Sequence, residues 1–231
     1  MSVISFAAAI VGGAFAALVL AQFAVRHRPY QLVWGCALAM FAAAALIEAL
    51  AAVWGWSPAG YRLYYYLGGI TNVGWLGAGS LLLLFRRAGL VGVGTMLALS
   101  LAAIPAVVLS PLHPELLLAA DPGRGVIGAP AEVFAPITNT LGSAALIGGA
   151  LWSMWAAWRR HAPGAFVVGM AAIAGGALFA ALTHGLAGQV GGERALAPLG
   201  ELIGATLMFT GYLVLEARRR HGATLHASHQ R

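Results

Sequence analysis

The sequence predicts an all-α polytopic membrane protein: a bundle of seven transmembrane helices with its N-terminus outside and its C-terminus in the cytoplasm. Three observations carry this prediction. Hydrophobic residues make up 61% of the 231 residues and charged residues only 9%, whereas soluble domains carry about 25% charged residues. Seven apolar stretches are each long enough to cross a bilayer. Arginine clusters follow the first, third, fifth and seventh of these stretches.

The spans follow one another with only short connections between most of them. An apolar helix needs about 20 residues to cross about 30 Å of hydrocarbon. The first, third, fourth and sixth stretches are strongly apolar, while the fifth and seventh carry polar residues near one end and still reach this length. We expect the spans at about 2–24, 31–55, 61–85, 90–112, 132–157, 164–189 and 195–217.

The ends of the chain add two expectations. The first stretch has no basic segment before it and arginines after it, which favours a retained helix over a cleaved signal peptide. Residues 1–217 are expected to form a single domain, followed by a basic cytoplasmic tail over 218–231 that is disordered or rests on anionic lipid. The long connection 113–131 is broken by proline and glycine and predicts a surface loop, with a lid over a pocket as the alternative.

The arginines set the expected orientation. Cytoplasmic loops carry an excess of basic residues, and here the basic residues fall mostly on one side of the predicted bundle. That side holds ten arginines, and the other side holds Arg62, Arg124 and Arg194. The ten are Arg26, Arg28, Arg86, Arg87, Arg159, Arg160, Arg218, Arg219, Arg220 and Arg231. This distribution predicts a multi-pass protein of the cell (inner or plasma) membrane, and it explains the net charge of +6 without nucleic acid as a partner.

Glycine indicates how the helices pack. The chain contains 31 glycines, and many lie inside the predicted spans. Small residues let helix backbones approach each other closely in lipid. We therefore expect a tightly packed bundle. The span glycines behind this expectation are Gly68, Gly69, Gly74, Gly77, Gly79, Gly142, Gly148, Gly149, Gly175 and Gly176.

A few polar residues inside the spans point to a functional site. An ionisable residue at mid-span costs about 2.5–3.5 kcal/mol on insertion scales, so such residues usually face the bundle interior. With the orientation given above, these residues fall in the outer half of the bilayer. The candidate ligand-binding residues are Glu48, Arg62, Tyr65, Asn72, Asn139, His184 and Glu201.

Each candidate has an expected role. Glu48 and Glu201 would act as counter-charges or hydrogen-bond acceptors, and Arg62 would fix an anionic group or neutralise an acid. Tyr65 and Asn72 would orient the ligand, and His184 would add a pH-sensitive donor. Asn139 shares a helical face with Pro136 and Ser143 in the fifth span. A purely architectural use of these residues as interhelical contacts is the competing interpretation.

Composition and motifs leave several functions open and exclude one. Retinal needs a lysine for its Schiff base, and the chain has none, so covalently bound retinal is excluded. No cofactor or metal is expected, since zinc-binding spacings are missing and His113 is the only available partner for His184 in a haem site. The favoured function is binding of a small molecule or lipid, in a receptor or sensor with a possible cytoplasmic partner protein. The alternative is a membrane-embedded enzyme or an ion or proton transporter that uses the same Glu48, His184 and Glu201.

Overall fold

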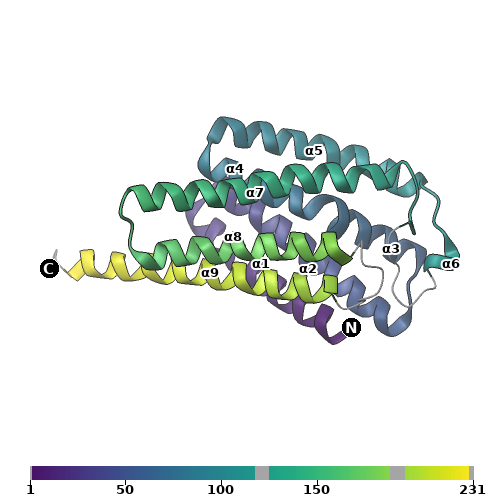
Figure 1. Cartoon of the computed structure of the whole chain (residues 1–231), viewed down its shortest axis with the longest axis horizontal. Helices are drawn as coiled ribbons and strands as arrows, with labels where there is room; N and C mark the ends of the chain where they lie inside the picture. The colour runs from purple at the N-terminus through teal and green to yellow at the C-terminus, as the bar shows by residue number, and fades with distance from the viewer. Residues whose placement is uncertain (1, 118–124, 188–195, 229–231) are drawn as a thin grey trace.

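The computed structural model describes residues 2–117, 125–187 and 196–228 (Figure 1). Everything described is helix or connection, apart from an isolated bridge between Leu112 and Ile127. The elements are α1 (Ser2–Arg26), α2 (Pro29–Trp54), α3 (Pro58–Tyr64), η1 (Tyr65–Thr71), α4 (Asn72–Leu84), α5 (Arg86–Leu109), α6 (Pro114–Leu117), η2 (Ala131–Val133), α7 (Phe134–Arg159), α8 (Gly164–Ala187) and α9 (Leu196–Ser228).

Six helical segments of the described chain are long and apolar enough to cross a membrane, so the all-α, multi-pass fold is confirmed. These segments are Val3–Arg26, Pro29–Trp54, Pro58–Leu84, Arg86–Leu109, Ala131–Arg159 and Pro198–Ala217. The sixth predicted span corresponds to α8, in which Gly164–Ala180 forms a shorter apolar segment. The seventh crossing and the orientation of the termini therefore stay predictions.

Two boundaries differ from those expected from hydropathy. α5 begins at Arg86, directly after Phe85, so the arginine pair of this connection lies in the first turn of the helix rather than in a loop. α9 continues to Ser228, although the sequence predicted a tail from residue 218 that is disordered or rests on anionic lipid. Figure 1 shows α9 projecting beyond the other helices. Hydropathy marks where a helix leaves the hydrocarbon, but a helix can continue past that point.

The third span is not a continuous α-helix. It begins at Pro58 behind the N-cap Ser57, whose Oγ accepts a hydrogen bond from the Gly60 amide (3.0 Å). Between α3 and α4 the chain makes a π-helical segment, η1, with the sequence YYLGGIT. π-helical segments are rare in proteins, but those that occur are often found at functional sites. This one lies near the middle of the helical run Pro58–Leu84.

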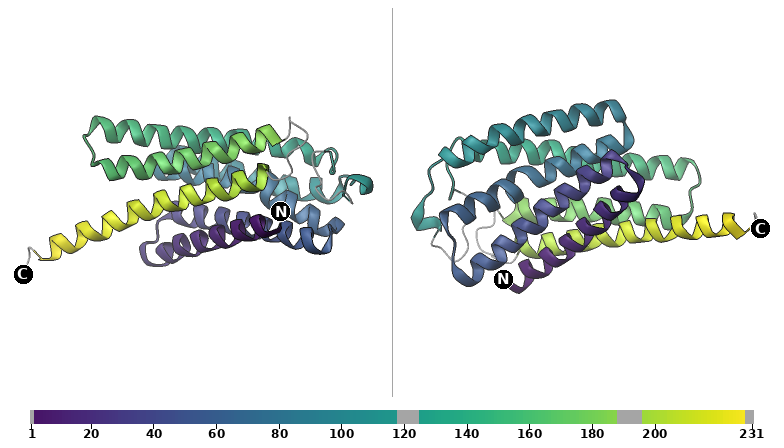
Figure 2. Two further views of the ribbon diagram at one scale, coloured as in Figure 1. Left: turned by 60° about the horizontal axis from the view of Figure 1, so that its bottom comes forward. Right: turned by 180° about the vertical axis from the view of Figure 1, so that it is seen from behind.

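The helices form two tight antiparallel pairs joined by a third pair. α1 packs along α2, and α8 packs along α9, while α4 packs along α7. α2 contacts α4, α7 contacts α8, and α9 contacts α1, so these six helices form a closed circuit; α5 packs outside it against α4. In the left view of Figure 2, α9 (yellow) passes between α8 (green) and α1 (purple).

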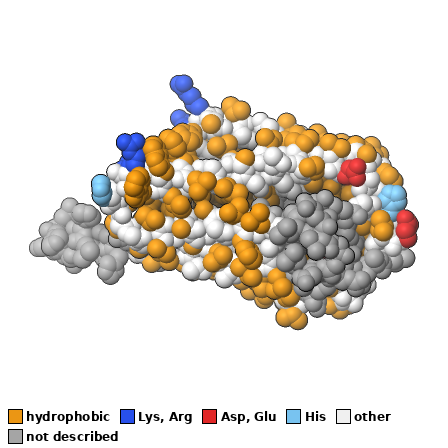
Figure 3. Space-filling view, in the orientation of Figure 1, with side chains coloured by type: hydrophobic (Ala, Val, Ile, Leu, Met, Phe, Trp, Pro, Cys, Tyr) orange, Lys and Arg blue, Asp and Glu red, His pale blue; other side chains and the backbone are white. Residues whose placement is uncertain are grey.

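The two ends of the bundle differ in charge. The turns α1–α2, α4–α5 and α7–α8 bring Arg28, Arg86, Arg87 and Arg160 to one end, called here the arginine end. The opposite, or far, end carries the connections α2–α3, α5–α7 and α8–α9. Figure 3 shows basic side chains gathered at one end of the visible face and acidic side chains at the other.

Apolar side chains fill the middle of the circuit. Phe15 and Leu38 form part of a buried cluster, and Leu76 and Met208 pack against it from α4 and α9. The Phe15 ring lies 5.2 Å from the rings of both Phe209 and Tyr212, measured between centroids. This cluster, called here the central apolar core, joins four helices and separates the polar groups at the two ends of the bundle.

Glycines allow direct contact between backbones at several of the expected positions, although a Cβ on Gly148 or Gly175 would meet nothing within 4 Å. A Cβ on Gly77 of α4 would lie 2.4 Å from the carbonyl oxygen of Gly142 on α7. The same arrangement recurs between α8 and α9, where a Cβ on Gly176 would lie 2.5 Å from the carbonyl oxygen of Gly204. Real Cβ atoms do not approach so closely, so these positions require glycine.

Alanine at a contact glycine is expected to destabilise the bundle. Gly77→Ala and Gly142→Ala each place a methyl group against backbone atoms, and overpacking of this kind costs ~1–3 kcal/mol. Thermal unfolding in detergent measures the effect. Gly148→Ala is the matched control, because it lies on the same helix as Gly142 and its Cβ would meet nothing within 4 Å. Equal midpoints for Gly142→Ala and Gly148→Ala would contradict the proposed packing.

Candidate functional site

Polar side chains inside the bundle gather between the central apolar core and the far end. They come from α2, η1, α4, α7 and α9 and are called here the polar layer. Its members are Glu48, Thr71, Asn72, Thr138, Asn139 and Glu201. Thr71 and Thr138 are completely buried, and Asn72 is 7% exposed. Polar groups at such depth need partners inside the protein or in a ligand.

Asn139 connects α7 to the π-helical segment. Its Nδ2 donates a hydrogen bond to the Gly69 carbonyl oxygen at 3.0 Å. The two helices are close here because Gly142, one turn further along α7, lies against the backbone of Val73 and Gly74. The other amide atom, Asn139 Oδ1, is buried and has no hydrogen-bond partner.

Asn72 begins α4 and faces the bundle interior. It lies one turn before Leu76, which packs against the central apolar core, and residues four apart share a helical face. Its Oδ1 is buried without a hydrogen-bond partner. Since α3 starts at Pro58, Asn72 lies close to the middle of the span rather than in its outer half. An unpaired buried acceptor costs about 1–3 kcal/mol, so this atom would gain from a donor.

The threonines of the layer are satisfied locally. Thr71 Oγ1 donates to the carbonyl oxygen of Tyr66 or Leu67, at 3.0 and 3.1 Å. Thr138 Oγ1 lies 2.9 Å from the Phe134 carbonyl oxygen, one turn back in its own helix. A hydroxyl has a single proton, which is committed here to the backbone. These threonines therefore stabilise the layer and offer little to a ligand.

Glu48 and Glu201 lie on faces that point into the bundle. Glu48 is one turn beyond Ala44, whose Cβ lies 3.0 Å from the Cβ position of Gly68 in η1. Glu201 is seven residues before Met208, so the two share the helical face that meets the central apolar core. Glu48 thus lies beside η1, and Glu201 lies on the far-end side of the core.

Arg62 and Tyr65 lie outside the polar layer. The Arg62 guanidinium donates to the carbonyl oxygens of Val107 and Ser110, the latter at 2.8 Å, and so caps the C-terminus of α5. A cation is favourable there because it meets the negative end of the helix dipole. The Tyr65 ring stacks on Tyr61, with centroids 6.2 Å apart, in the cluster beneath the α5–α7 connection.

The structure therefore separates the seven predicted residues. Asn72 and Asn139 both lie beside η1, and Glu48 and Glu201 face the same interior from α2 and α9. Arg62 and Tyr65 pack toward α5 instead. His184 belongs to α8, but its side chain lies outside the described residues. Part of the 113–131 connection also lies outside them. Its described end, with Val126 and Ile127 buried, packs with the far-end cluster of Tyr61 and Val107.

A second polar cluster, at the arginine end, was not predicted. Arg26 of α1 forms an ion pair with Glu216 of α9 at 3.0 Å and also donates to Gln22 Oε1 at 3.2 Å. Gln31 Nε2 of α2 donates to the same Gln22 oxygen at 3.0 Å. Glu216 is 9% exposed and Gln31 is 3% exposed. The sequence separation of Arg26 and Glu216 explains why no local pattern revealed the pair.

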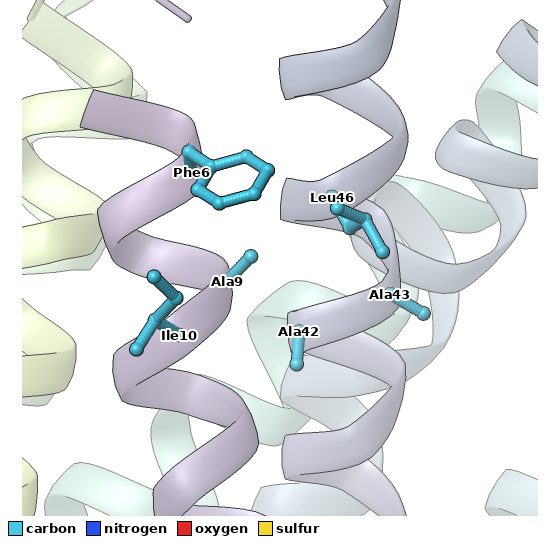
Figure 4. Close-up of a pocket in the computed structure, with 6 residues that line it drawn as sticks. All are labelled: Phe6, Ala9, Ile10, Ala42, Ala43 and Leu46. Carbon is cyan, nitrogen blue, oxygen red and sulfur yellow. The ribbon is translucent and has the colours of Figure 1, made fainter. Parts of the chain in front are cut away.

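A groove between α1 and α2 is apolar. Phe6, Ala9 and Ile10 of α1 face Ala42, Ala43 and Leu46 of α2 across a groove of about 270 Å³ (Figure 4). Ligand pockets range over about 300–1,000 Å³ and combine apolar walls with a few polar groups. This groove lacks the polar groups, and none of the seven predicted residues lines it. Within the described chain, no group of three or more metal-binding side chains is present.

Comparisons with known proteins assign no family. No protein-family model, no curated protein and no solved structure matches this chain. The functional argument therefore depends on the geometry of this molecule alone.

The ion pair at the arginine end is expected to hold α1 against α9. Arg26→Gln or Glu216→Gln removes one partner of a charged hydrogen bond, which is worth ~1.5–3 kcal/mol, and lowers the thermal midpoint in detergent. The double variant Arg26→Glu/Glu216→Arg should recover part of the loss because the pair is restored in reverse. Arg28→Gln, at an exposed site on the same turn, is the control. If the thermal midpoint of the double variant falls by the sum of the two single-variant decreases, the pairing is contradicted.

Proposed function

We propose that this protein is a seven-helix inner-membrane protein that binds a small molecule or lipid headgroup in the polar layer, as a receptor or sensor does. In this proposal α8 also crosses the membrane, as the sixth of seven spans, and the arginine end faces the cytoplasm. The polar layer then lies between the middle of the membrane and its outer face. Glu48, Asn72, Asn139 and Glu201 are the residues proposed to surround the ligand.

One observation carries this proposal. The amide oxygens of Asn72 and Asn139 are buried beside the π-helical segment and lack a hydrogen-bond donor. Lipid offers no donor at this depth, so unsatisfied polar groups are costly there. An architectural role explains the donor side of Asn139, which binds Gly69. It leaves the two acceptors unexplained, and a ligand with hydrogen-bond donors would satisfy both.

Transport by the same residues is the second candidate. Broken helices near the middle of the membrane form the substrate sites of many transporters, and η1 interrupts the third span at that level. A second polar cluster, around Arg26 and Glu216, lies beyond the central apolar core. Solute or proton flux into liposomes that is lost in Glu201→Gln would mark transport, and ligand binding without flux would mark a receptor.

The proposed orientation predicts which turns a membrane-impermeant maleimide reaches in intact cells. The chain has one cysteine, Cys36, so labelling starts from a Cys36→Ser background. Glu115→Cys, in the exposed far-end connection, should be labelled in intact cells. His161→Cys, in the exposed turn between α7 and α8, should be labelled only after the membrane is permeabilised. The reverse pattern would overturn the orientation.

The proposed site predicts that a ligand stays bound during mild purification. Extraction of the purified protein and mass spectrometry should identify a small molecule or lipid at near-stoichiometric amounts. Asn72→Leu should reduce its amount strongly, because the amide oxygen that accepts its hydrogen bond is removed.

Gln31→Leu is the matched control for this experiment. Gln31 is also a buried amide with an unpartnered oxygen, but it lies at the arginine end. It should leave the amount of bound ligand unchanged. A co-purified molecule that is lost equally from both variants, or none in the wild type above the detergent blank, would contradict the site.

A further inference from the structure

A series of exposed aromatic rings ends in an arginine on the outside of the bundle, at its arginine end. Phe85 is the single residue between α4 and α5, and its ring lies 6.0 Å from that of Trp152 on α7, measured between centroids. The Trp152 ring lies 5.0 Å from that of Trp155. The Arg159 guanidinium carbon lies 5.1 Å from the centroid of the Trp155 ring. These four side chains are called here the aromatic–arginine strip.

Helix packing holds the strip in place. A Cβ on Gly149 of α7 would lie 3.1 Å from Leu84 Cδ1 at the end of α4. Gly149 is one turn before Trp152, so the same close approach brings the α4–α5 connection, and with it Phe85, against the Trp152 ring. The strip is therefore positioned by the contact between α4 and α7.

The strip lies on the outer face of α7. The buried residues toward this end of the helix are Leu146, Ala150 and Ala157, and helical spacing places them opposite to Trp152 and Trp155. Trp152 is 48% exposed and Trp155 is 45% exposed, so each ring keeps an open side. This surface is available to whatever surrounds the bundle.

The strip crosses the level at which hydrocarbon gives way to lipid headgroups. The apolar segment Ala131–Arg159 ends at Arg159, and the segment Arg86–Leu109 begins at Arg86. Tryptophan is enriched at this same level of a membrane. Trp152 precedes Arg159 by seven residues, which places it about 10 Å deeper in the bilayer. The strip thus extends from the acyl chains to the phosphates of one leaflet.

The charge on this surface is positive. Arg86, Arg87, Arg159 and Arg160 are all exposed, and α4, α5 and α7 contain no acidic residue. No ion pair joins any of these four arginines to a carboxylate of the described chain. Figure 3 shows basic side chains and no acidic ones at this end of the visible face. The surface therefore complements an anion.

We propose that the aromatic–arginine strip binds an anionic phospholipid, with the phosphate against Arg159 and an acyl chain along Trp152 and Phe85. This site goes beyond the proposed function, since it lies on the outer surface and at the end opposite to the polar layer. The planar guanidinium matches a phosphate through paired hydrogen bonds. The Trp155 ring holds this guanidinium in place by a cation–π contact. Arg86, beside Phe85, adds charge of the same sign.

Other occupants fit the strip less well. A water-soluble partner would reach the arginines but not Trp152, which lies within the apolar segment of α7. A zwitterionic headgroup would bring its own cation to a surface of arginines. A second copy of this chain, bound through the same face by a two-fold axis, would place these arginines opposite each other. An anionic lipid supplies both the apolar chains and the counter-charge.

Lipid retention tests the headgroup. The purified full-length protein in dodecyl maltoside is equilibrated with increasing dioleoyl phosphatidylglycerol or dioleoyl phosphatidylcholine, and native mass spectrometry counts the lipids that stay bound. The inference predicts saturable binding of phosphatidylglycerol and about tenfold weaker binding of phosphatidylcholine, since one basic residue near anionic lipid is worth roughly fivefold. Glycerol 3-phosphate, which has a phosphate but no acyl chains, should not displace the lipid at equal concentration.

Variants then assign the bound lipid to the strip. Arg159→Gln should weaken phosphatidylglycerol binding about tenfold, because a charge-assisted hydrogen-bond pair is lost. Trp155→Leu keeps an apolar side chain but removes the ring under the guanidinium, and should weaken binding about threefold. Two matched controls should bind as the wild type does. They are Arg28→Gln, an exposed arginine of another turn at this end, and Trp158→Leu, an exposed tryptophan of α7 outside the strip.

Each alternative result overturns the inference for a different reason. Equal retention of the two lipids, or of neither, would show that the surface does not recognise anionic lipid. Equal losses in Arg159→Gln and Arg28→Gln would show that binding follows net charge. Displacement by glycerol 3-phosphate would mark a site for soluble phosphate, and a dimer that dissociates in Trp155→Leu would mark an interface between copies. Loss in Asn72→Leu but not in Arg159→Gln would move the lipid to the polar layer, which overturns this inference and supports the proposed function.

Discussion

The direct contact between the backbones of α4 and α7 determines the rest of the candidate site. Gly77 and Gly142 leave no room for a Cβ between these helices, so α7 approaches closely enough for Asn139 to reach the Gly69 carbonyl. That hydrogen bond supports the π-helical segment, where the regular backbone pattern is interrupted. The same approach fixes the Asn139 amide with its nitrogen bonded to Gly69 and its oxygen, Oδ1, unpaired. In lipid, where association has no hydrophobic driving force, such close packing is the main source of stability.

The division of the bundle into two polar regions follows from one face of α9. Glu201, Met208 and Tyr212 lie along this face, and Glu216 follows one turn later. Met208 belongs to the central apolar core, which separates the polar layer from the Arg26–Glu216 cluster. In a sensor with this architecture α9 would connect the two polar regions, since it packs against both α1 and α8. A transporter would have to open the core around Phe15 and Phe209.

Sequence reasoning captured the parts of this fold that have a periodic or compositional signal. Apolar stretches located most helix boundaries to within a few residues, although α9 continues well past the expected end of the last span. Glycines such as Gly77 and Gly176 correctly indicated close packing, whereas Gly148 and Gly175 make no close contact. Helical spacing placed Asn72 and Glu201 on interior faces but gave no information about which helix each face meets. Spacing within the third span could not reveal that Arg62 caps α5, because the carbonyls that it binds lie about 45 residues away in the chain. Arg62 was therefore expected to bind a ligand or an acid. The π-helical segment has no periodicity of its own, and the Gly68–Gly69 pair was its only local signal.

The central claim is that the amide oxygens of Asn72 and Asn139 accept hydrogen bonds from a bound ligand rather than from the protein. A high-resolution electron cryomicroscopy map of the protein, purified gently from its own membrane, tests this claim most directly. The account predicts non-protein density within hydrogen-bonding distance of both oxygens, between α4 and α7 and the interior faces of α2 and α9. A map without such density, in which Asn72 Oδ1 and Asn139 Oδ1 both accept hydrogen bonds from groups of the protein, would contradict it.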